Sequence, residues 1–171
     1  MTGDDGVPLL CLGDIAAPAR ALLAERRRLC TVEPRDTHAP LDLVAQGDSA
    51  SHALRLALER ATAVRALVLL GPTAIVRDGT PGAGADAALL GRLGEIAIPS
   101  LALFGTRDTA APPEAARHYR ARIPACNLMF VYDASQAMTA ERPEAVAALV
   151  LDFLERHDLF LVRRESDVIY P

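Results

Sequence analysis

Short apolar runs alternate with amphipathic, alanine-rich stretches along most of the chain. Runs of leucine and β-branched residues that stop at a glycine or proline predict strands over residues 7–12, 29–33, 41–45, 64–70, 99–104 and 127–132. Apolar positions spaced three and four residues apart predict helices over residues 16–28, 50–61, 85–93 and 112–122. A last helix begins near Pro143, and its apolar face comprises Val146, Leu149, Val150, Phe153 and Leu154.

This alternation predicts the fold class. Strands that are apolar throughout and that alternate with helices imply a mostly parallel sheet covered on both faces. We therefore predict an α/β protein, a three-layer α/β/α sandwich with about six strands, formed as one domain by residues 1–158. Sheets of this kind bind ligands beyond the carboxyl ends of their strands, so functional residues are expected in the loops that end the strands.

The last residues follow a different pattern. Residues 159–162 and 168–170 are short β-type runs on either side of a polar centre at 163–167. This pattern predicts a C-terminal hairpin or arm over residues 159–171. We expect the arm to cover an edge strand of the sheet or to reach a second subunit, which leaves a homodimer open.

Composition narrows the classes of function. With 51% hydrophobic residues, 23% charged residues and a net charge of −4, the chain is typical of a globular protein. No apolar run reaches the roughly 20 residues needed to cross a bilayer, and the first residues lack the basic start of a signal peptide. We therefore expect a cytoplasmic protein with no membrane contact. The acidic balance and the 4% of aromatic residues argue against nucleic-acid binding.

The basic residues and the cysteines of the chain have a simple structural interpretation. All basic residues are arginines, and the only dense basic run, Arg26-Arg27-Arg28, is predicted to end the first helix, where positive charge favours the helix dipole. The three cysteines are far apart in sequence and lack metal-ligand spacing. Buried free thiols in a reducing compartment are the favoured interpretation.

A candidate nucleophile follows the third predicted strand. The segment Gly47-Asp48-Ser49-Ala50-Ser51 lies between a strand and a helix and matches the G-x-S-x-G nucleophile elbow except at its last residue. In that motif the serine lies on a tight, strained turn, which small neighbours allow. The alternative interpretation is a small-residue turn in which Ser49 or Ser51 caps the helix.

Four segments, in order, resemble the α/β-hydrolase superfamily. LLCLG at residues 9–13 resembles that family's third strand and its His-Gly turn, with Leu12 in place of the histidine. Residues 43–72 resemble the elbow, its helix and the next strand; residues 98–124 resemble the strand that ends in the acid of the catalytic triad; and residues 141–157 resemble the final helix. The resemblance implies Ser49 as nucleophile, Asp108 as acid, and Gly13 and Ala50 as oxyanion donors.

The chain also departs from the family pattern. Counting back from the final helix, the position of the base histidine is occupied by Gln136, whose amide cannot accept a proton near neutral pH. Loss of a triad histidine costs on the order of a millionfold in turnover. The strands that usually precede residue 7 and a lid domain are both missing, so we expect a minimal fold that is shortened at its N-terminal side.

No other group is an obvious replacement for the base. His38 is the only histidine predicted in a loop at a strand's carboxyl end, while His52, His118 and His157 are placed on helices. A metal site built from Asp14, Asp48 and Asp108 is an alternative, but acids at strand ends are common turn residues, so we predict neither a metal nor a cofactor.

Two hypotheses remain from the sequence. The first is a catalytically impaired or non-catalytic hydrolase homologue that binds a small molecule or another protein. The second is an atypical serine hydrolase of the esterase type that uses Ser49 and an unidentified base.

Overall fold

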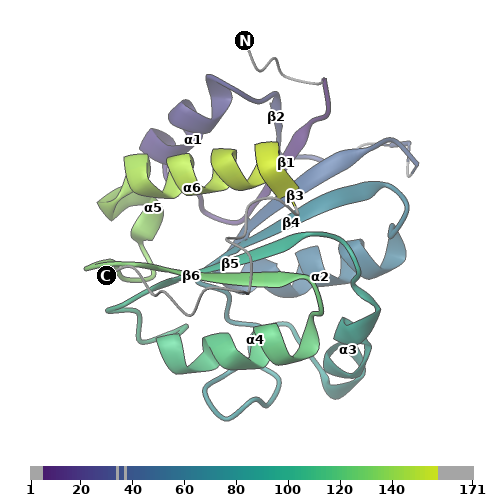
Figure 1. Ribbon diagram of the computed structural model, residues 1–171, viewed down its shortest axis with the longest axis vertical. Helices are drawn as coiled ribbons and strands as arrows, with labels where there is room; N and C mark the ends of the chain where they lie inside the picture. Colours follow the sequence, from purple (N-terminus) through teal and green to yellow (C-terminus); the bar gives the residue numbers. More distant parts are fainter. Residues whose placement is uncertain (1–5, 34, 37, 158–171) are drawn as a thin grey trace.

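A computed structural model describes residues 6–33, 35–36 and 38–157. The arm predicted over residues 159–171 lies outside the described residues. The strands are β1 (Leu9–Leu12), β2 (Leu29–Cys30), β3 (Leu41–Gln46), β4 (Val64–Leu70), β5 (Ser100–Gly105) and β6 (Cys126–Val131). They form a six-stranded sheet in the order β2-β1-β3-β4-β5-β6, and every neighbouring pair is parallel (Figure 1). The predicted three-layer α/β fold is confirmed.

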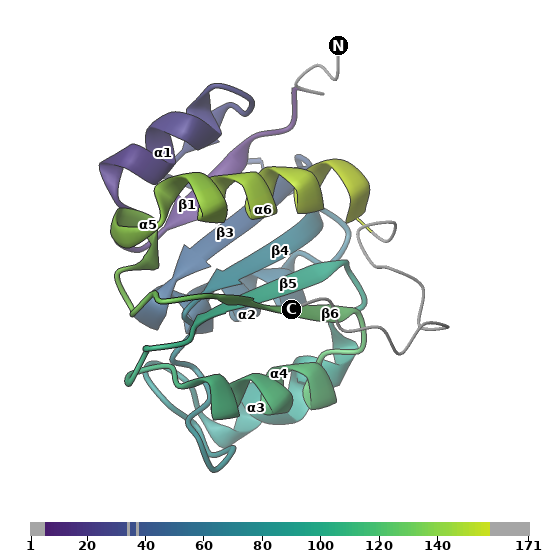
Figure 2. The ribbon, with the colours of Figure 1, turned by 60° about the vertical axis from the view of Figure 1, so that its left-hand side comes forward.

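Helices cover both faces of the sheet (Figure 2). One face packs against α1 (Ala17–Ala24), α5 (Met138–Glu141) and α6 (Pro143–Arg156). The other packs against α2 (Ala50–Glu59), α3 (Ala87–Arg92) and α4 (Ala116–Arg122). Three 3-10 turns, η1 (Gly47–Ser49), η2 (Leu93–Glu95) and η3 (Pro113–Ala115), adjoin α2, α3 and α4.

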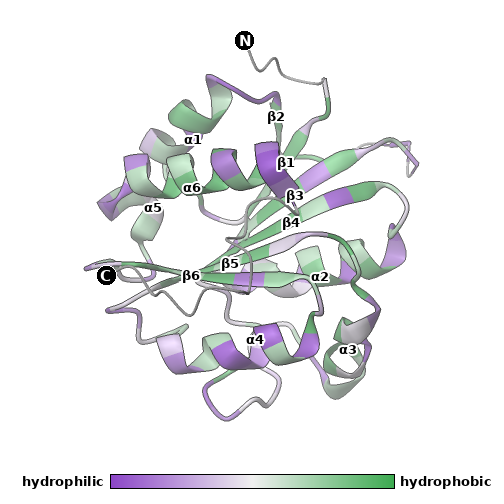
Figure 3. Ribbon diagram, viewed as in Figure 1, coloured by the Kyte–Doolittle hydropathy of each residue, from purple (hydrophilic) through white to green (hydrophobic). Residues whose placement is uncertain are grey.

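The core is divided by the sheet into two apolar clusters. In β3, for example, Leu43 contacts one cluster and Val44 the other, because successive side chains of a strand point to opposite faces. Figure 3 shows the strands as the most hydrophobic part of the chain, with polar residues on the outer surfaces of the helices. Burial on both faces explains why the strands lack the alternating pattern of a half-exposed sheet.

Several details differ from the sequence prediction, among them the strand predicted over residues 29–33, which ends at Cys30. The first helix ends at Ala24, before Arg26, Arg27 and Arg28, so the prediction that these arginines form its last turn is wrong. The reason is tertiary: the Arg27 guanidinium is buried and donates to the fully buried carboxylate of Asp42 (Nη2 to Oδ2, 2.5 Å). The short helix α5, which has four residues, was not predicted.

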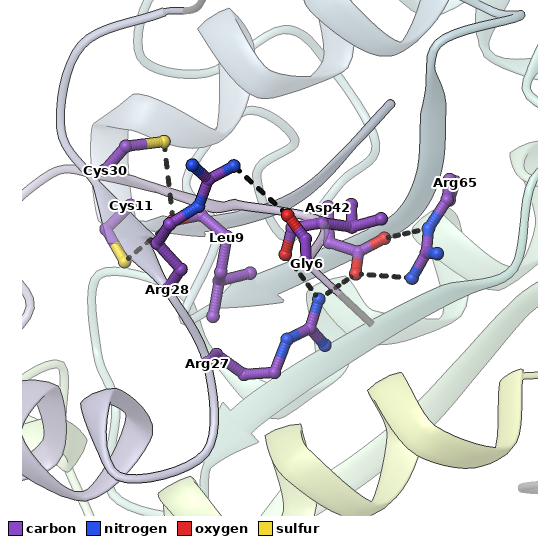
Figure 4. Close-up of polar contacts among 9 residues, drawn as sticks. Gly6, Leu9, Cys11, Arg27, Arg28, Cys30, Asp42 and Arg65 are labelled. Carbon is purple, nitrogen blue, oxygen red and sulfur yellow. Dashed lines mark hydrogen bonds and ion pairs between the residues drawn. The ribbon is translucent and has the colours of Figure 1, made fainter. Parts of the chain in front are cut away.

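Asp42 is the centre of a charged cluster at the amino-terminal end of the strands (Figure 4). Arg65 donates to the same carboxylate through Nε (3.2 Å) and Nη2 (3.1 Å), and Arg27 also donates to the Val7 carbonyl (3.2 Å). We call Arg27, Asp42 and Arg65 the N-edge cluster. It fixes the turn after α1 to β3 and β4 at the end of the sheet opposite to the loops where ligands are expected.

Candidate functional site

A cavity of about 540 Å³ opens at the carboxyl ends of the strands. Its wall contains loop residues that follow β1, β3, β4, β5 and β6, which is where a parallel sheet is expected to bind ligands. The lining residues are Asp14, Ala16, Gln46, Gly47, Asp48, Ser49, Thr73, Ala110, Gln136, Ala137, Thr139 and Ala140.

The tight turn between β3 and α2 is centred on Gly47. Gly47 is the only residue between the two elements with a positive φ (+59°), whereas Ser49 has ordinary right-handed helical angles (φ −69°, ψ −9°). We expected Ser49 itself on the sharp bend, and its backbone does not have that conformation. The strained position of a nucleophile elbow is therefore occupied by Gly47.

The direction of a side chain at position 47 supports this assignment. A Cβ built on Gly47 would lie 2.9 Å from Nε2 of Gln136, the residue predicted at the base position. Ser49 instead packs beside the loop after β1: its Oγ lies 2.9 Å from the place that a Cβ of Gly13 would take. Ser49 and Gln136 share no hydrogen bond in the described part of the chain.

A pattern of small residues in the sequence fits an elbow motif that is centred on position 47. Ala45 and Ser49 are small and lie two residues before and two residues after Gly47, as the glycines of the elbow motif flank its serine. Ser49 then takes the place of the second small residue, whose side chain must fit against a neighbouring loop. The serine at position 49 matches the motif two residues further along, where the backbone is helical.

Asp108 and Gln136 are brought together beneath the cavity. Asp108 is 3% exposed, and its Oδ1 accepts the N–H groups of Ala110 and Ala111, each at 2.9 Å. Gln136 donates from Nε2 to the Gly71 carbonyl (3.1 Å). Burial raises the pKa of the Asp108 carboxyl above its usual value, while the two N–H groups oppose that shift and the Glu141 carboxylate adds to it.

The two predicted oxyanion donors, Gly13 and Ala50, have different surroundings in the structure. Gly13 has a φ of +85° at the end of β1, and a Cβ there would lie 2.7 Å from the Gln46 carbonyl oxygen, so the close approach of the two loops requires glycine. Ala50 is fully buried and its N–H donates to the Gly47 carbonyl, so that N–H is not available to a ligand. If the turn is centred on Gly47, the backbone N–H that follows the central residue is that of Asp48. This N–H lies in the first turn of η1, where backbone N–H groups have no acceptor within the helix.

The wall of the cavity is cross-linked by neutral hydrogen bonds. Thr139 accepts the N–H of Ala16 (3.1 Å) and donates to Oε1 of Gln46 (2.9 Å), and Nε2 of Gln46 donates to the Gln136 carbonyl (3.0 Å). At the mouth, the Thr73 hydroxyl donates to the Asp48 carboxylate (2.6 Å). These bonds join the loops after β1, β3 and β6 into one wall.

None of the four histidines, all of which are in the described residues, lines the cavity. The ring of His52 contacts the Glu33 carboxylate (2.8 Å), His118 contacts the Arg77 carbonyl (3.0 Å), and His157 packs edge-on against Phe153. The His38 N–H donates to Asp36 in an exposed turn. The structure thus brings Gly47, Asp108 and Gln136 together and leaves the imidazoles elsewhere.

No metal centre or membrane span is evident in the part of the chain that the structure describes. There, no group of three or more His, Cys, Asp or Glu side chains is arranged to hold a metal ion. None of its helices is both long and apolar enough to cross a bilayer. Cys11 and Cys126 are buried and Cys30 is half-buried, and all three are free thiols.

The order of the six parallel strands and the helices on both faces of the sheet are those of the α/β-hydrolase fold. Solved structures with this fold superpose on most of the chain. An α/β-hydrolase enzyme from the sediment metagenome of the Mar Chica lagoon in Morocco has a TM-score of 0.70 at 14% identity, covering 90% of this chain and 93% of its own. The enol-lactonase of Burkholderia xenovorans LB400 has a TM-score of 0.70 at 17% identity, covering 89% and 94%.

A thermophilic esterase from Thermogutta terrifontis is similar to the same extent, with a TM-score of 0.70, 16% identity and coverage of 91% and 92%. No protein-family model matches the sequence, and no curated protein matches it. At these identities the likeness shows the fold, so the chemistry must be argued from the residues of the site.

Proposed function

We propose that the protein is a non-catalytic α/β-hydrolase-fold protein that binds a small molecule in the cavity above Gly47 without hydrolysing it. The observation that carries this proposal is the turn after β3, where the residue that faces Gln136 is a glycine. Covalent hydrolysis needs a nucleophilic side chain and a base that takes its proton, and positions 47 and 136 supply neither.

The cavity supports the binding half of the proposal. Its volume of about 540 Å³ is in the usual range of small-molecule sites, and its wall is held in place by the Ala16–Thr139–Gln46–Gln136 hydrogen bonds. A fixed wall lowers the entropy cost of binding because little must be ordered when the ligand enters. The cytoplasmic location and the homodimer stay predictions from the sequence.

The second candidate is an atypical serine hydrolase. It is favoured by one observation: Ser49 lines the same cavity. Against it, Ser49 lies in helical backbone beside Gly13, and the nearest carboxylate in sequence, that of Asp48, already accepts a hydrogen bond from Thr73. The alternative requires a base that the described residues do not place beside Ser49.

A fluorophosphonate probe separates the two candidates, because it reacts only with activated serines. We expect the native protein to remain unlabelled over a range of pH. The matched variant is Ser49→Ala, which should be indistinguishable from the native protein. Stoichiometric labelling that disappears in Ser49→Ala would replace the proposal with the second candidate.

A gain of function tests the assignment of position 47. The double variant Gly47→Ser/Gln136→His restores a hydroxyl on the strained turn and an imidazole between it and Asp108. We expect fluorophosphonate labelling at position 47 in the double variant and none in either single variant. Labelling that persists when Ser49→Ala is added assigns the reaction to position 47, whereas labelling lost on that addition contradicts the register proposed here.

A further inference from the structure

Two buried oxygens beneath the cavity have no hydrogen-bond donor among the described residues. They are Oδ2 of Asp108 and Oε1 of Gln136, both shielded from solvent. They lie 3.0 Å and 3.1 Å from one point, the position that a Cβ of Gly71 would occupy, and the next nearest atom is Nε2 of Gln136 at 3.4 Å. Two acceptors therefore flank the same small space.

The remaining polar atoms of the two side chains are already satisfied. Oδ1 of Asp108 accepts two N–H groups, and Nε2 of Gln136 donates to the Gly71 carbonyl. Turning the Gln136 amide over would direct its Nε2 toward Asp108, but it would set Oε1 against the Gly71 carbonyl oxygen. An unpaired buried acceptor is unfavourable and a second acceptor near it adds repulsion, whereas a proton shared between the two oxygens would satisfy both.

We propose that Asp108 binds a proton on Oδ2 and donates it to Oε1 of Gln136, forming a neutral acid–amide pair that ties the loop after β5 to the loop after β6. The proton comes from solvent, and only the O–H bond is formed. When the carboxyl ionises, the pair opens and the side-chain amide of Gln136 keeps only its hydrogen bond to the Gly71 carbonyl. The inference is independent of whether the cavity binds a ligand.

The surrounding charges favour the protonated form. The charged group that acts on Asp108 is the acidic Glu141 on α5, which favours the protonated carboxyl. Arg107, next to Asp108 in sequence, is paired with Asp133 (2.7 Å), which also holds Arg142 (2.9 Å). On the β4 side the pair faces Gly71 and on the β3 side Gly47, and neither residue has a side chain. Burial, which raises the pKa of Asp108, acts in the same direction.

The sign of the pH effect follows from the bound proton. The folded protein holds this proton more tightly than the unfolded chain, whose aspartates titrate near about 3.9. The contribution to stability is therefore complete below that pH, is lost as the pH rises through the folded-state pKa of Asp108, and is absent above it.

The first measurement is a carboxyl carbon-13 NMR titration of the native protein. We expect the Asp108 resonance to titrate above about 3.9, the value of an aspartate in an unfolded chain. The second is the melting temperature against pH for Asp108→Asn, whose amide N–H replaces the acid O–H. We expect this variant to lose part of the pH dependence and to melt above the native protein once Asp108 is ionised.

Asp152→Asn, which removes the carboxylate that pairs with Arg156 on α6, is the control and should keep the part of the pH dependence that Asp108→Asn loses. An Asp108 resonance that titrates at or below about 3.9 would overturn the proposal. So would an Asp108→Asn variant that melts below the native protein at every pH, because an amide N–H that replaces the acid O–H should preserve the bond to Gln136. The titration on the native protein decides the question even if the variant does not fold.

Discussion

The two ends of the parallel sheet hold polar groups of opposite kinds. At the amino-terminal end, the N-edge cluster places a fully buried carboxylate between two guanidinium groups. At the carboxyl end, a cavity of about 540 Å³ is lined by amides, hydroxyls and the carboxylates of Asp14 and Asp48, with no arginine among its lining residues.

This difference indicates that the two ends of the sheet have different roles. A buried charge is tolerated only with close partners, so the N-edge cluster constrains where α1 ends and how β3 and β4 align. The wall at the other end is joined by hydrogen bonds between uncharged side chains and leaves room for a ligand. We therefore expect substitutions at the amino-terminal end to change mainly stability and those at the carboxyl end to change mainly ligand binding.

The largest expected effect is at the N-edge cluster. Asp42→Ala leaves the buried Arg27 guanidinium without its partner, which should lower the free energy of unfolding by about 3–5 kcal/mol in a denaturant titration. The double variant Asp42→Leu/Arg27→Met removes both charges and should recover most of that loss. A single variant as stable as the native protein would show that the cluster contributes no constraint.

A smaller effect on stability is expected at the carboxyl end, where the close approach of two loops requires a glycine at position 13. Gly13→Ala introduces a Cβ at positive φ, 2.7 Å from the Gln46 carbonyl oxygen, and should cost about 2–3 kcal/mol in the same assay. Gly91→Ala in α3 is the control, because its Cβ meets no atom within 4 Å. The control should be neutral or slightly stabilising. Equal effects at the two glycines would contradict the close approach of the two loops.

The smallest effect concerns the wall of the cavity. Thr139→Val keeps the shape of the side chain but removes the hydroxyl that joins Ala16 to Gln46, so the free energy of unfolding should fall by about 1 kcal/mol. Thr80→Val, in an exposed loop, should change it by less than about 0.5 kcal/mol. A loss at Thr139 as large as at Asp42 would remove the distinction between the two ends of the sheet.

Particular residues show where sequence reasoning reached its limit. The mostly parallel sheet of about six strands follows from apolar runs that end at glycine or proline, and the structure confirms it. Arg26-Arg27-Arg28 was assigned to a helix because a local rule suits basic residues there, whereas burial of Arg27 against Asp42 ends the helix earlier. Asp42 itself lies within a predicted apolar strand, and nothing local indicates that a carboxylate there is paired.

The assignment of the turn after β3 shows the same limit. Gly47 and Ser49 are both small residues two positions apart, and the elbow motif fits the chain in either register. Only the backbone angles and the direction toward Gln136 distinguish them. The expectation that position 136 lacks a base does not depend on this choice, because it follows from residue chemistry alone.

By itself the sequence predicted the layered α/β fold, and it places a carboxylate after the fifth strand and an amide at position 136. It could do so because apolar periodicity and side-chain chemistry are local properties of the chain. Tertiary structure decided which residue occupies the strained turn, which carboxylate is buried between arginines and which oxygens lack a donor. These features depend on contacts between segments far apart in sequence, and those contacts exist only once the sheet has formed.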